Sequence, residues 1–256
     1  MSECHLRMGG VRVMAKSRGY QKRFYRESTK DSGLIGQEVI VKETDLFIFA
    51  DKDIKDIAEE IVKKYRTEIE DYIKHRPEFM TSLEPIIGDD LAADIIKEMV
   101  RTTGLAGVGP MASVAGAIAE FTGNELSAYS RQIIIENGGD IFMKSDKVRT
   151  VAVYAGDSPL SNKIFIKIKP KDTPVGICTS SGTVGHSLSF GKADACVIIA
   201  KSAILADAVA TATCNRIKEK QDIAPSLEFA ISIKGVKAAV AILGKDFGSI
   251  GNIELT

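Results

Sequence analysis

The sequence predicts an α+β fold, in which helices pack against antiparallel sheets, and three observations support this prediction. Apolar residues recur at intervals of three and four through residues 53–103, which is typical of amphipathic helices. Beyond Arg131 the pattern changes to short β-branched runs separated by Gly, Asp, Ser and Pro, which is typical of strands. Most of the helices precede the strands instead of alternating with them, so a doubly wound sheet is disfavoured.

The first fifty residues contain a basic stretch and a predicted strand. Residues 7–26 are rich in Arg and Lys with interleaved aromatic residues, a pattern that fits an RNA-binding arm or a strand with a solvated basic face. We favour the strand, because Glu27 and Asp31 follow and weaken the positive field. Residues 38–50 form a β-branched and aromatic run, which predicts a strand or a hairpin arm.

Three helices are predicted next. The first covers residues 53–75, with Asp53 as its N-cap and Pro77 after its end. The second covers residues 91–103 and stops at Gly104. The third covers residues 111–121, where Ala and Gly allow close packing. We expect residues 1–256 to form a single domain, within which residues 51–104 pack as a helical subdomain.

The second half of the chain is predicted to be mainly β, with one long helix. Ser202 is a good N-cap for a helix over residues 202–218. Before this helix, strands are predicted at residues 132–136, 140–143, 148–154, 163–169, 175–179 and 195–200, and after it at residues 238–243 and 251–255.

The bulk properties exclude several classes of protein. The formal net charge is +0 and the pI is about 6.8, so a general attraction to nucleic acid or anionic lipid is not expected. The longest apolar stretches are interrupted by Gly or by charged residues, and no signal peptide is recognisable. The 4 Cys lie far apart, which argues against a zinc knuckle or a disulfide framework and predicts a reducing, cytoplasmic location.

Asp207 and Thr211 form the first candidate site. Their spacing of four places both side chains on one face of the predicted helix, where they offer two oxygens to a hard cation such as Mg²⁺. The alternative is an ordinary Ala-rich helix with an Asp and a Thr that bonds back to the helix backbone. On spacing alone the alternative is favoured.

The second candidate is the loop over residues 176–185, which is rich in Gly, Ser and Thr. Backbone N–H groups in such loops bind anions, but no Lys follows, so this is not a Walker motif, and the hydroxyls equally serve turns. His186, next to the loop, is a candidate general base or donor, although a lone His is more often structural.

Two glycine-rich turns are further candidates. Gly138 and Gly139 lie between two predicted strands, which is a good hairpin signal and a modest ligand signal. Gly107, Gly109 and Pro110 precede the third helix, where they fit either an anion at the helix N-terminus or tight packing.

Several segments together resemble the ApbE superfamily, whose best known members are flavin transferases that move FMN from FAD onto protein threonines. The chain resembles most closely the branch called UPF0280. The resemblance implies an ApbE-like fold, related to the T-fold, with antiparallel sheets packed against helices. It rests on RFYRE (23–27), KETDL (42–46), GVGPMASVAGAIAE (107–120), ENGGDIF (136–142), CTSSGTVGHSLSFGKADA (178–195) and LADAVATA (205–212).

The resemblance also implies roles for individual residues. Asp207 and Thr211 match the family's magnesium-binding Asp and Thr, and the backbone carbonyl of Ala112 matches the third ligand. His186 and Asp207 are the implied catalytic residues, although the Asp and Pro of the family's HIIDP motif are absent after His186, and Glu136 stands where the transferases have Asn. The implied cofactor-binding residues are Gly109, Pro110, Met111, Ser113, Gly138, Gly139, Asp140, Thr179, Ser180, Ser181, Gly182, Thr183 and His186.

Three functions remain open from the sequence. The first is a Mg²⁺-dependent FMN or nucleotidyl transferase that binds FAD or another adenine nucleotide. The second is an accessory role in sulfur assimilation, namely homocysteine formation from an aspartate-derived aldehyde with a ferredoxin-like or other redox protein as partner, in which Cys178 is either a reactive thiol or a small buried hydrophobe. The third is a non-catalytic nucleotide or flavin carrier. In each case we expect a homo-oligomer that binds neither membrane nor nucleic acid.

Overall fold

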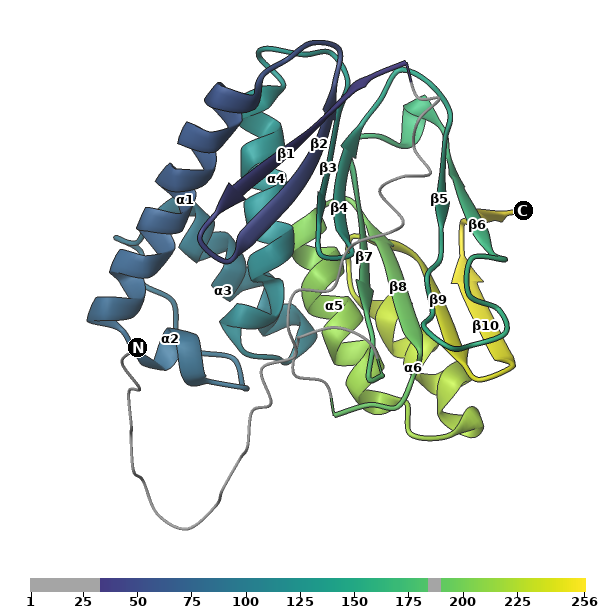
Figure 1. Ribbon diagram of the computed structural model, residues 1–256. Helices are drawn as coiled ribbons and strands as arrows, with labels where there is room; N and C mark the ends of the chain where they lie inside the picture. Colours follow the sequence, from purple (N-terminus) through teal and green to yellow (C-terminus); the bar gives the residue numbers. More distant parts are fainter. Residues whose placement is uncertain (1–32, 184–189) are drawn as a thin grey trace, which may run out of the picture. The chain divides into compact units, whose positions relative to one another are not determined.

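An eight-stranded antiparallel sheet organises the computed structural model, which describes residues 33–183 and 190–256 (Figure 1). The strands follow the order β1-β2-β3-β4-β7-β8-β9-β10, and every neighbouring pair is antiparallel. Their bounds are β1 Ile35–Val41, β2 Thr44–Ala50, β3 Ile133–Asn137, β4 Asp140–Lys144, β7 Val175–Ser180, β8 Ala195–Ala200, β9 Val236–Leu243 and β10 Asp246–Gly251.

A second, smaller sheet contains three antiparallel strands in the order β11-β6-β5. These are β5 Arg149–Ala152, β6 Phe165–Ile168 and β11 Glu254–Leu255. In the chain β5 and β6 lie between β4 and β7, yet β4 pairs directly with β7 in the large sheet. The chain therefore leaves the large sheet after β4, builds the small sheet and returns.

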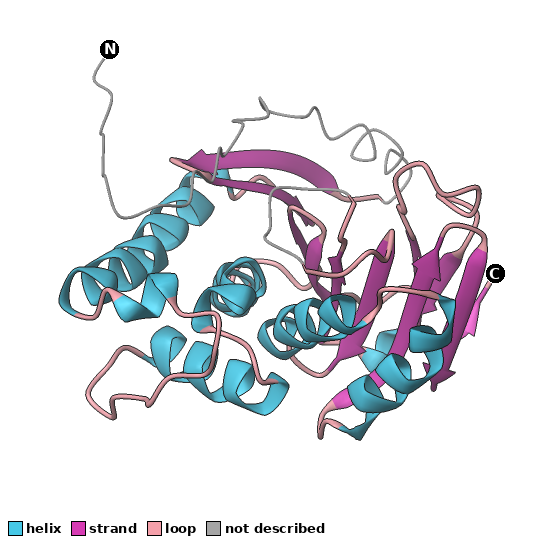
Figure 2. Cartoon of the chain, turned by 90° about the horizontal axis from the view of Figure 1, so that it is seen from below, coloured by secondary structure: helices cyan, strands magenta, loops and turns pink. Residues whose placement is uncertain are grey.

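The helices cover one face of the large sheet, as Figure 2 shows. Their apolar faces join β3, β7, β8 and β9 in one hydrophobic core. The helices are α1 Lys55–His75, α2 Glu78–Thr81, α3 Asp94–Ala106, α4 Val114–Leu126, α5 Ala203–Arg216 and α6 Ile223–Ser232, and a 3-10 turn, η2 Pro110–Ser113, leads into α4.

The opposite face of the large sheet packs on the small sheet through a second core. Along β7 and β8 the side chains alternate between the two cores, as period-two strands require. Ile177 and Val197 face the small sheet, whereas Cys178 and Cys196 face the helices. The centre of the large sheet is therefore buried on both sides, which explains why β8 is buried along its whole length, whereas the edge strands β1 and β10 keep exposed residues.

The predicted α+β class is confirmed, and the differences lie mainly at element boundaries. The run over residues 38–50 is a complete hairpin, β1–β2. The second helix extends beyond Gly104 to Gly107, whose φ of 73° provides the left-handed C-cap. Gly104 inside a helix is tolerated because its position is exposed and unconstrained.

The prediction was wrong in two places near the carboxyl end of the chain. The closing strand expected over residues 251–255 is two strands, β10 in the large sheet and β11 in the small one. Helix α6 was not predicted, and Pro225 lies at its third position. A proline in the first turn of a helix is acceptable, since the N–H groups there have no partner within the helix.

Three sequence features lie outside the described residues: the basic stretch 7–26, the motif over residues 23–27, and His186. Within residues 33–183 and 190–256, no single helix is both long and apolar enough to span a membrane. Helix α3 and the segment Pro110–Leu126 meet that requirement only as a pair, with a bend of 100° between them.

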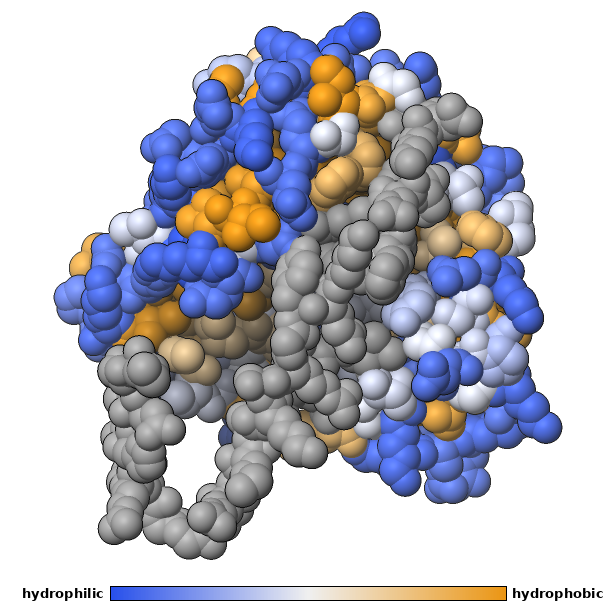
Figure 3. Space-filling model, viewed as in Figure 1, coloured by the Kyte–Doolittle hydropathy of each residue, from blue (hydrophilic) through white to orange (hydrophobic). Residues whose placement is uncertain are grey.

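Helix α1 is amphipathic, and its outer face carries charged residues that appear as hydrophilic surface in Figure 3. Its inner face is fixed to α4 by Tyr65, whose hydroxyl donates to Glu125 Oε1 at 2.5 Å and whose ring packs edge-on against Phe121. Lys64 also donates to Glu125. A carboxylate on α4 therefore holds two neighbouring residues of α1.

Helix α5 is buried on all sides and approaches α4 very closely. A Cβ atom placed on Gly116 would lie 2.3 Å from the carbonyl oxygen of Ala203. Real Cβ atoms do not reach this distance from backbone, so only glycine permits the approach. Gly116 thereby sets the spacing between the two helices.

We expect Gly116→Ala to lower the free energy of unfolding by roughly 3 kcal/mol, because the backbone of α5 must move to accommodate the methyl group. Gly104→Ala is the matched control, since its Cβ would meet no atom within 4 Å. It should raise the free energy of unfolding by roughly 0.5–1 kcal/mol through helix propensity. Urea denaturation measures both, and equal effects would contradict the close approach.

The Tyr65 phenol should lose its proton at a higher pH than an ordinary tyrosine does. Burial, followed by the hydrogen bond and charge of Glu125, raises the pKa of Tyr65 to about 12. Because the folded pKa exceeds the unfolded value of about 10, its contribution to stability is complete below pH 10 and disappears between pH 10 and about 12. The difference between wild-type and Tyr65→Phe absorbance titrations at high pH should show this phenol. A midpoint near 10 would refute the effect.

Candidate functional site

The turn between β3 and β4 presents backbone without side chains. Gly138 and Gly139 have φ values of 68° and 110°, as the two central residues of a tight hairpin require, and Asn137 pairs with Asp140 to close it. Gly139 N–H donates to Glu136 Oε1 at 3.1 Å, and its carbonyl accepts from the Thr179 N–H at 3.2 Å. The predicted hairpin is confirmed, and β7 holds its tip in place.

Asn137 connects this turn to the beginning of α4. Its Nδ2 donates to the carbonyl oxygen of Ala115 at 3.1 Å. Ala115 is the second residue of α4, so the amide side chain fixes the helix end against the hairpin.

Asp207 lies at the same helix end, although it comes from α5. The predicted N-cap of α5 is confirmed, since Ser202 Oγ accepts from the Leu205 N–H at 3.3 Å. One turn further along, Asp207 Oδ2 accepts from the Gly116 N–H of α4 at 2.9 Å. The positive end of the α4 dipole therefore faces the Asp207 carboxylate.

The bond between Gly116 and Asp207 occupies part of the helix end at which an anion was one of the two predicted possibilities. The N–H of Gly116 is already bonded to Asp207, and a Cβ on Gly109 would lie 1.8 Å from the carbonyl oxygen of Ser82. Gly109 N–H also donates to the Leu83 carbonyl at 2.9 Å. The tight-packing interpretation therefore accounts for Gly109 here, and the anion at this helix end is the protein's own carboxylate.

Two buried carboxylates, Asp140 and Asp207, lie near each other. Asp140 is 8% exposed and Asp207 is 9% exposed. Burial raises the pKa of Asp207 well above its usual range, and the negative charge of Asp140 raises it further, whereas the N–H groups of Gly116 and Ala115 lower it. The repulsion between the two carboxylates means that a positive charge placed between them would be strongly favoured.

Cys178 lies beside both carboxylates and is fully buried. It is the cross-strand partner of Asp140, and its Sγ donates to the carbonyl oxygen of Ala203 at 3.3 Å. Burial, followed by the charges of Asp140 and Asp207, raises the pKa of the Cys178 thiol well above its usual range. The side chain therefore stays a neutral thiol, which agrees with the interpretation as a small buried residue.

Of the other two predicted magnesium ligands, Thr211 shares α5 with Asp207, and Ala112 lies in the turn before α4. Thr211 is one turn after Asp207 on α5 and is half-buried. Ala112 lies in η2, which contacts α5 and leads into the α4 end that faces Asp207. Within residues 33–183 and 190–256, no group of three or more His, Cys, Asp or Glu side chains is arranged so that it could hold a metal ion. A cation here would thus rely on hydroxyl and carbonyl oxygens besides carboxylate.

The loop predicted to bind phosphate is partly strand. Thr179 and Ser180 are the last residues of β7, and their partners Val197 and Cys196 face opposite cores. Ser180 therefore faces α5, while Thr179 faces the small sheet. Only the Ser180 side chain is thus directed to the side that carries Asp207.

The residues after β7 are held by local hydrogen bonds. Gly182 N–H donates to the Ala193 carbonyl at 2.8 Å, and Thr183 Oγ1 donates to Asp194 Oδ1 at 3.0 Å. The N–H of Thr183 donates to Ser181 Oγ at 3.1 Å. These bonds join residues 181–183 to residues 193–194, and His186 lies between them, outside the described residues.

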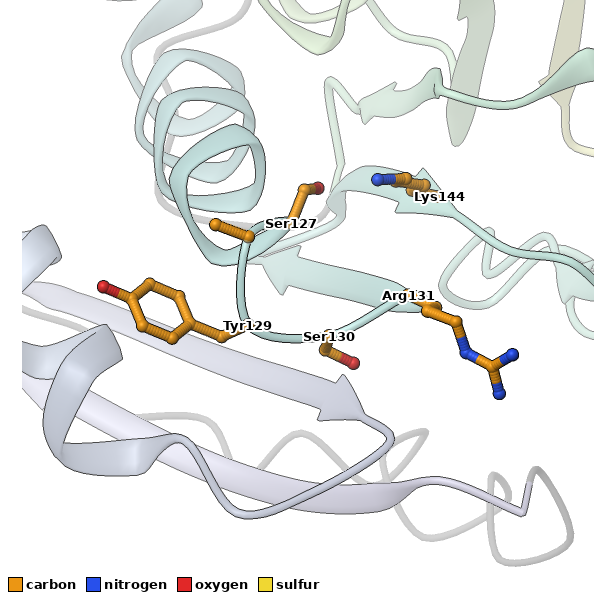
Figure 4. A pocket seen from close by; sticks show the side chains of 6 residues that line it. Ser127, Tyr129, Ser130, Arg131 and Lys144 are labelled. Carbon is orange, nitrogen blue, oxygen red and sulfur yellow. The ribbon is translucent and has the colours of Figure 1, made fainter.

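Two surface pockets lie away from these residues. One of about 310 Å³ is lined by Ser127, Tyr129, Ser130, Arg131 and Lys144, and Figure 4 shows Tyr129 and Arg131 pointing in opposite directions. It lies where β3 begins and β4 ends, at the far end of these strands from the glycine turn. The other, of about 420 Å³, is lined by α1 and the segment before α3. Neither contains a predicted site residue.

Sequence reasoning missed Gly116, Asn137 and Glu120 as parts of this site. Gly116 and Glu120 lie in the segment 107–120 that carries the family resemblance, and Asn137 lies in the predicted hairpin. Their contacts join residues 22 to 91 positions apart, and no local pattern reveals such contacts.

Solved structures with this fold come from flavin transferases. The flavin transferase ApbE from Vibrio cholerae aligns with a TM-score of 0.57 and 10% identity, over 85% of this chain and 96% of that one. The flavinyl transferase ApbE of Pseudomonas stutzeri, in its apo form, aligns with a TM-score of 0.57 and 12% identity, over 85% and 93% of the two chains. The ApbE-like fold predicted from the sequence is confirmed.

Sequence relatives are much closer. A UPF0280 protein of Methanocaldococcus jannaschii is 41% identical over 223 residues, 85% of this chain and 91% of that protein. A UPF0280 protein of Methanopyrus kandleri is 39% identical over 225 residues, 85% and 91% of the two chains. The family model described as AbpE bacteria matches residues 26–236. The chain therefore belongs to the UPF0280 family of ApbE-like proteins.

Proposed function

We propose that this protein is flavin-transferase-like and binds Mg²⁺ together with FAD or another adenine nucleotide beside Asp207. The observation that carries the proposal is the pair of buried carboxylates, Asp140 and Asp207, between the glycine turn and the end of α4. The shared fold supports it, because the neighbouring structures are named as flavin transferases.

The donor set fits a hard cation. Carboxylate, hydroxyl and carbonyl oxygens are the ligands that Mg²⁺ accepts, and Asp207, Thr211 and the Ala112 carbonyl would supply them. Asp140 adds a second negative charge nearby. When bound, Mg²⁺ would offset the charge of a pyrophosphate and of its leaving nucleotide.

The chain's own residues would prepare this site before any ligand arrives. The Gly116 N–H holds one oxygen of Asp207, so the carboxylate need not reorient to meet a cation. Gly138 and Gly139 allow a ligand to approach the backbone without meeting a side chain. Asn137 keeps the glycine turn and the α4 end at a fixed separation.

The sulfur-assimilation hypothesis receives no support from the site. A reactive thiol must ionise, and Cys178 is fully buried among groups that raise its pKa. A non-catalytic carrier uses the same binding site as a transferase, so the two functions differ only in whether the bound nucleotide is cleaved.

In the presence of a chelator, we expect Asp207→Asn to leave the Tm unchanged or to raise it. We also expect this substitution to abolish the rise in Tm that Mg²⁺ causes. The folded pKa of Asp207 lies above its unfolded value, so ionisation weakens the fold as pH rises from about 4. The amide removes that charge and keeps an acceptor for Gly116. Mg²⁺ should raise the Tm of the wild type and of the control Asp51→Asn, but not that of Asp207→Asn. Asp51→Asn is the control, because Asp51 bonds the Arg131 and Gln132 N–H groups far from the site. An equal Mg²⁺ response in Asp207→Asn would refute the cation site.

Measuring FAD binding with and without Mg²⁺ tests the proposal that the site binds a flavin or adenine nucleotide. Calorimetry should show Mg²⁺-dependent binding that Asp207→Asn weakens more than roughly 100-fold, since even outer partners of metal ligands are worth 10–100-fold. Chromatography of the same mixtures then separates two functions. Water is the acceptor for the FMN group in these mixtures, so AMP and FMN released in equal amounts indicate a transferase-like enzyme, and intact bound FAD indicates a carrier. Absence of binding by any flavin or adenine nucleotide would refute the proposal.

A further inference from the structure

Helices α4 and α5 cap each other with carboxylates. Asp207 of α5 accepts from the Gly116 N–H at the beginning of α4. In return, Glu120 of α4 reaches the beginning of α5, where its Oε2 accepts from Ser202 Oγ at 2.7 Å and from the Ile204 N–H at 3.1 Å. Each helix thus supplies the negative charge that stabilises the positive end of the other.

Glu120 is kept at this position by its surroundings. Burial raises the pKa of the Glu120 carboxyl, and the Ser202 hydroxyl and the Ile204 and Ala203 N–H groups lower it. The half-buried carboxylate is thus held by two hydrogen bonds at one helix end. Ser202 already caps α5 through the Leu205 N–H, so Glu120 provides a second, longer-range connection to α4.

The position of α5 along its axis decides the geometry of the candidate site. Ala203, in its first turn, contacts both Gly116 and the Cys178 thiol. Asp207 follows one turn later and Thr211 one turn after that, on the same face. A shift of α5 along its axis would move both oxygens relative to Gly116 and Asp140 together.

We propose that Glu120 is a positioning residue for the cation site, which fixes α5 against α4 and thereby places Asp207 and Thr211. This inference rests on the proposed function, because it concerns the same Mg²⁺ site. Glu120 is one turn further along α4 than Gly116, and its carboxylate is bonded to Ser202 and Ile204 at the beginning of α5, one turn before Asp207, so we do not count it among the ligands.

The test measures the Mg²⁺ dissociation constant of the folded protein by calorimetry for four variants. Glu120→Ala should weaken Mg²⁺ binding roughly tenfold, as expected for an outer partner of a metal ligand. Glu120→Gln keeps an oxygen acceptor and should bind like the wild type. Glu120→Asp keeps the charge but is one CH₂ shorter, and should weaken binding.

Glu125→Ala is the matched control. Glu125 is on the same helix and also joins it to a neighbour, but that neighbour is α1, through Lys64 and Tyr65. This variant should lose stability and keep its Mg²⁺ affinity. A role limited to general stability would instead lower Mg²⁺ affinity in both Glu120→Ala and Glu125→Ala, or in neither.

The outcomes separate this inference from the proposed function. If the wild type binds Mg²⁺ and Glu120→Ala binds it equally well, the positioning role is wrong and the cation site stands. If Glu120→Ala does not fold, equal Mg²⁺ affinities of Glu120→Asp and Glu120→Gln overturn the positioning role. If the wild type binds no Mg²⁺, the cation site is wrong and the inference falls with it.

Discussion

The reciprocal capping of α4 and α5 is the contact on which the arrangement of the site depends. Each buried helix end has N–H groups that require acceptors, and here the acceptors are Asp207 and Glu120 from the opposing helix. The exchange is feasible only because Gly116 allows the two backbones to approach. The close packing at Gly116 and its hydrogen bond to Asp207 together place the Asp207 carboxylate beside the Gly138–Gly139 turn.

Much of the fold could be predicted because its signals are local. The period of α1, the Ser202 cap of α5 and the Gly138–Gly139 turn are all confirmed. The errors arose where two interpretations of one residue compete. Helix α3 does not end at Gly104 but at Gly107, where a positive φ is needed, and Pro225 lies in the first turn of the unpredicted helix α6.

The site was less accessible to sequence reasoning, because its geometry depends on contacts between distant segments. The family resemblance, and not the spacing of Asp207 and Thr211 alone, indicated a cation, and the proximity of Asp140 follows from the pairing of β4 with β7 and from the packing of α5 on β7. Nor could the sequence show that Thr179 and Ser180 face opposite cores. The side of the sheet that each side chain faces depends on the register of β7 with β8.

The excursion between β4 and β7 separates two kinds of position. Residues 145–174 leave the large sheet and return in a register that keeps Asp140 opposite Cys178. Inside the excursion, Val153, Ile166 and Ile168 are buried against the large sheet and must remain apolar to fill the second core. Its exposed positions carry no such constraint, so substitutions there should leave the pairing of β4 with β7 intact.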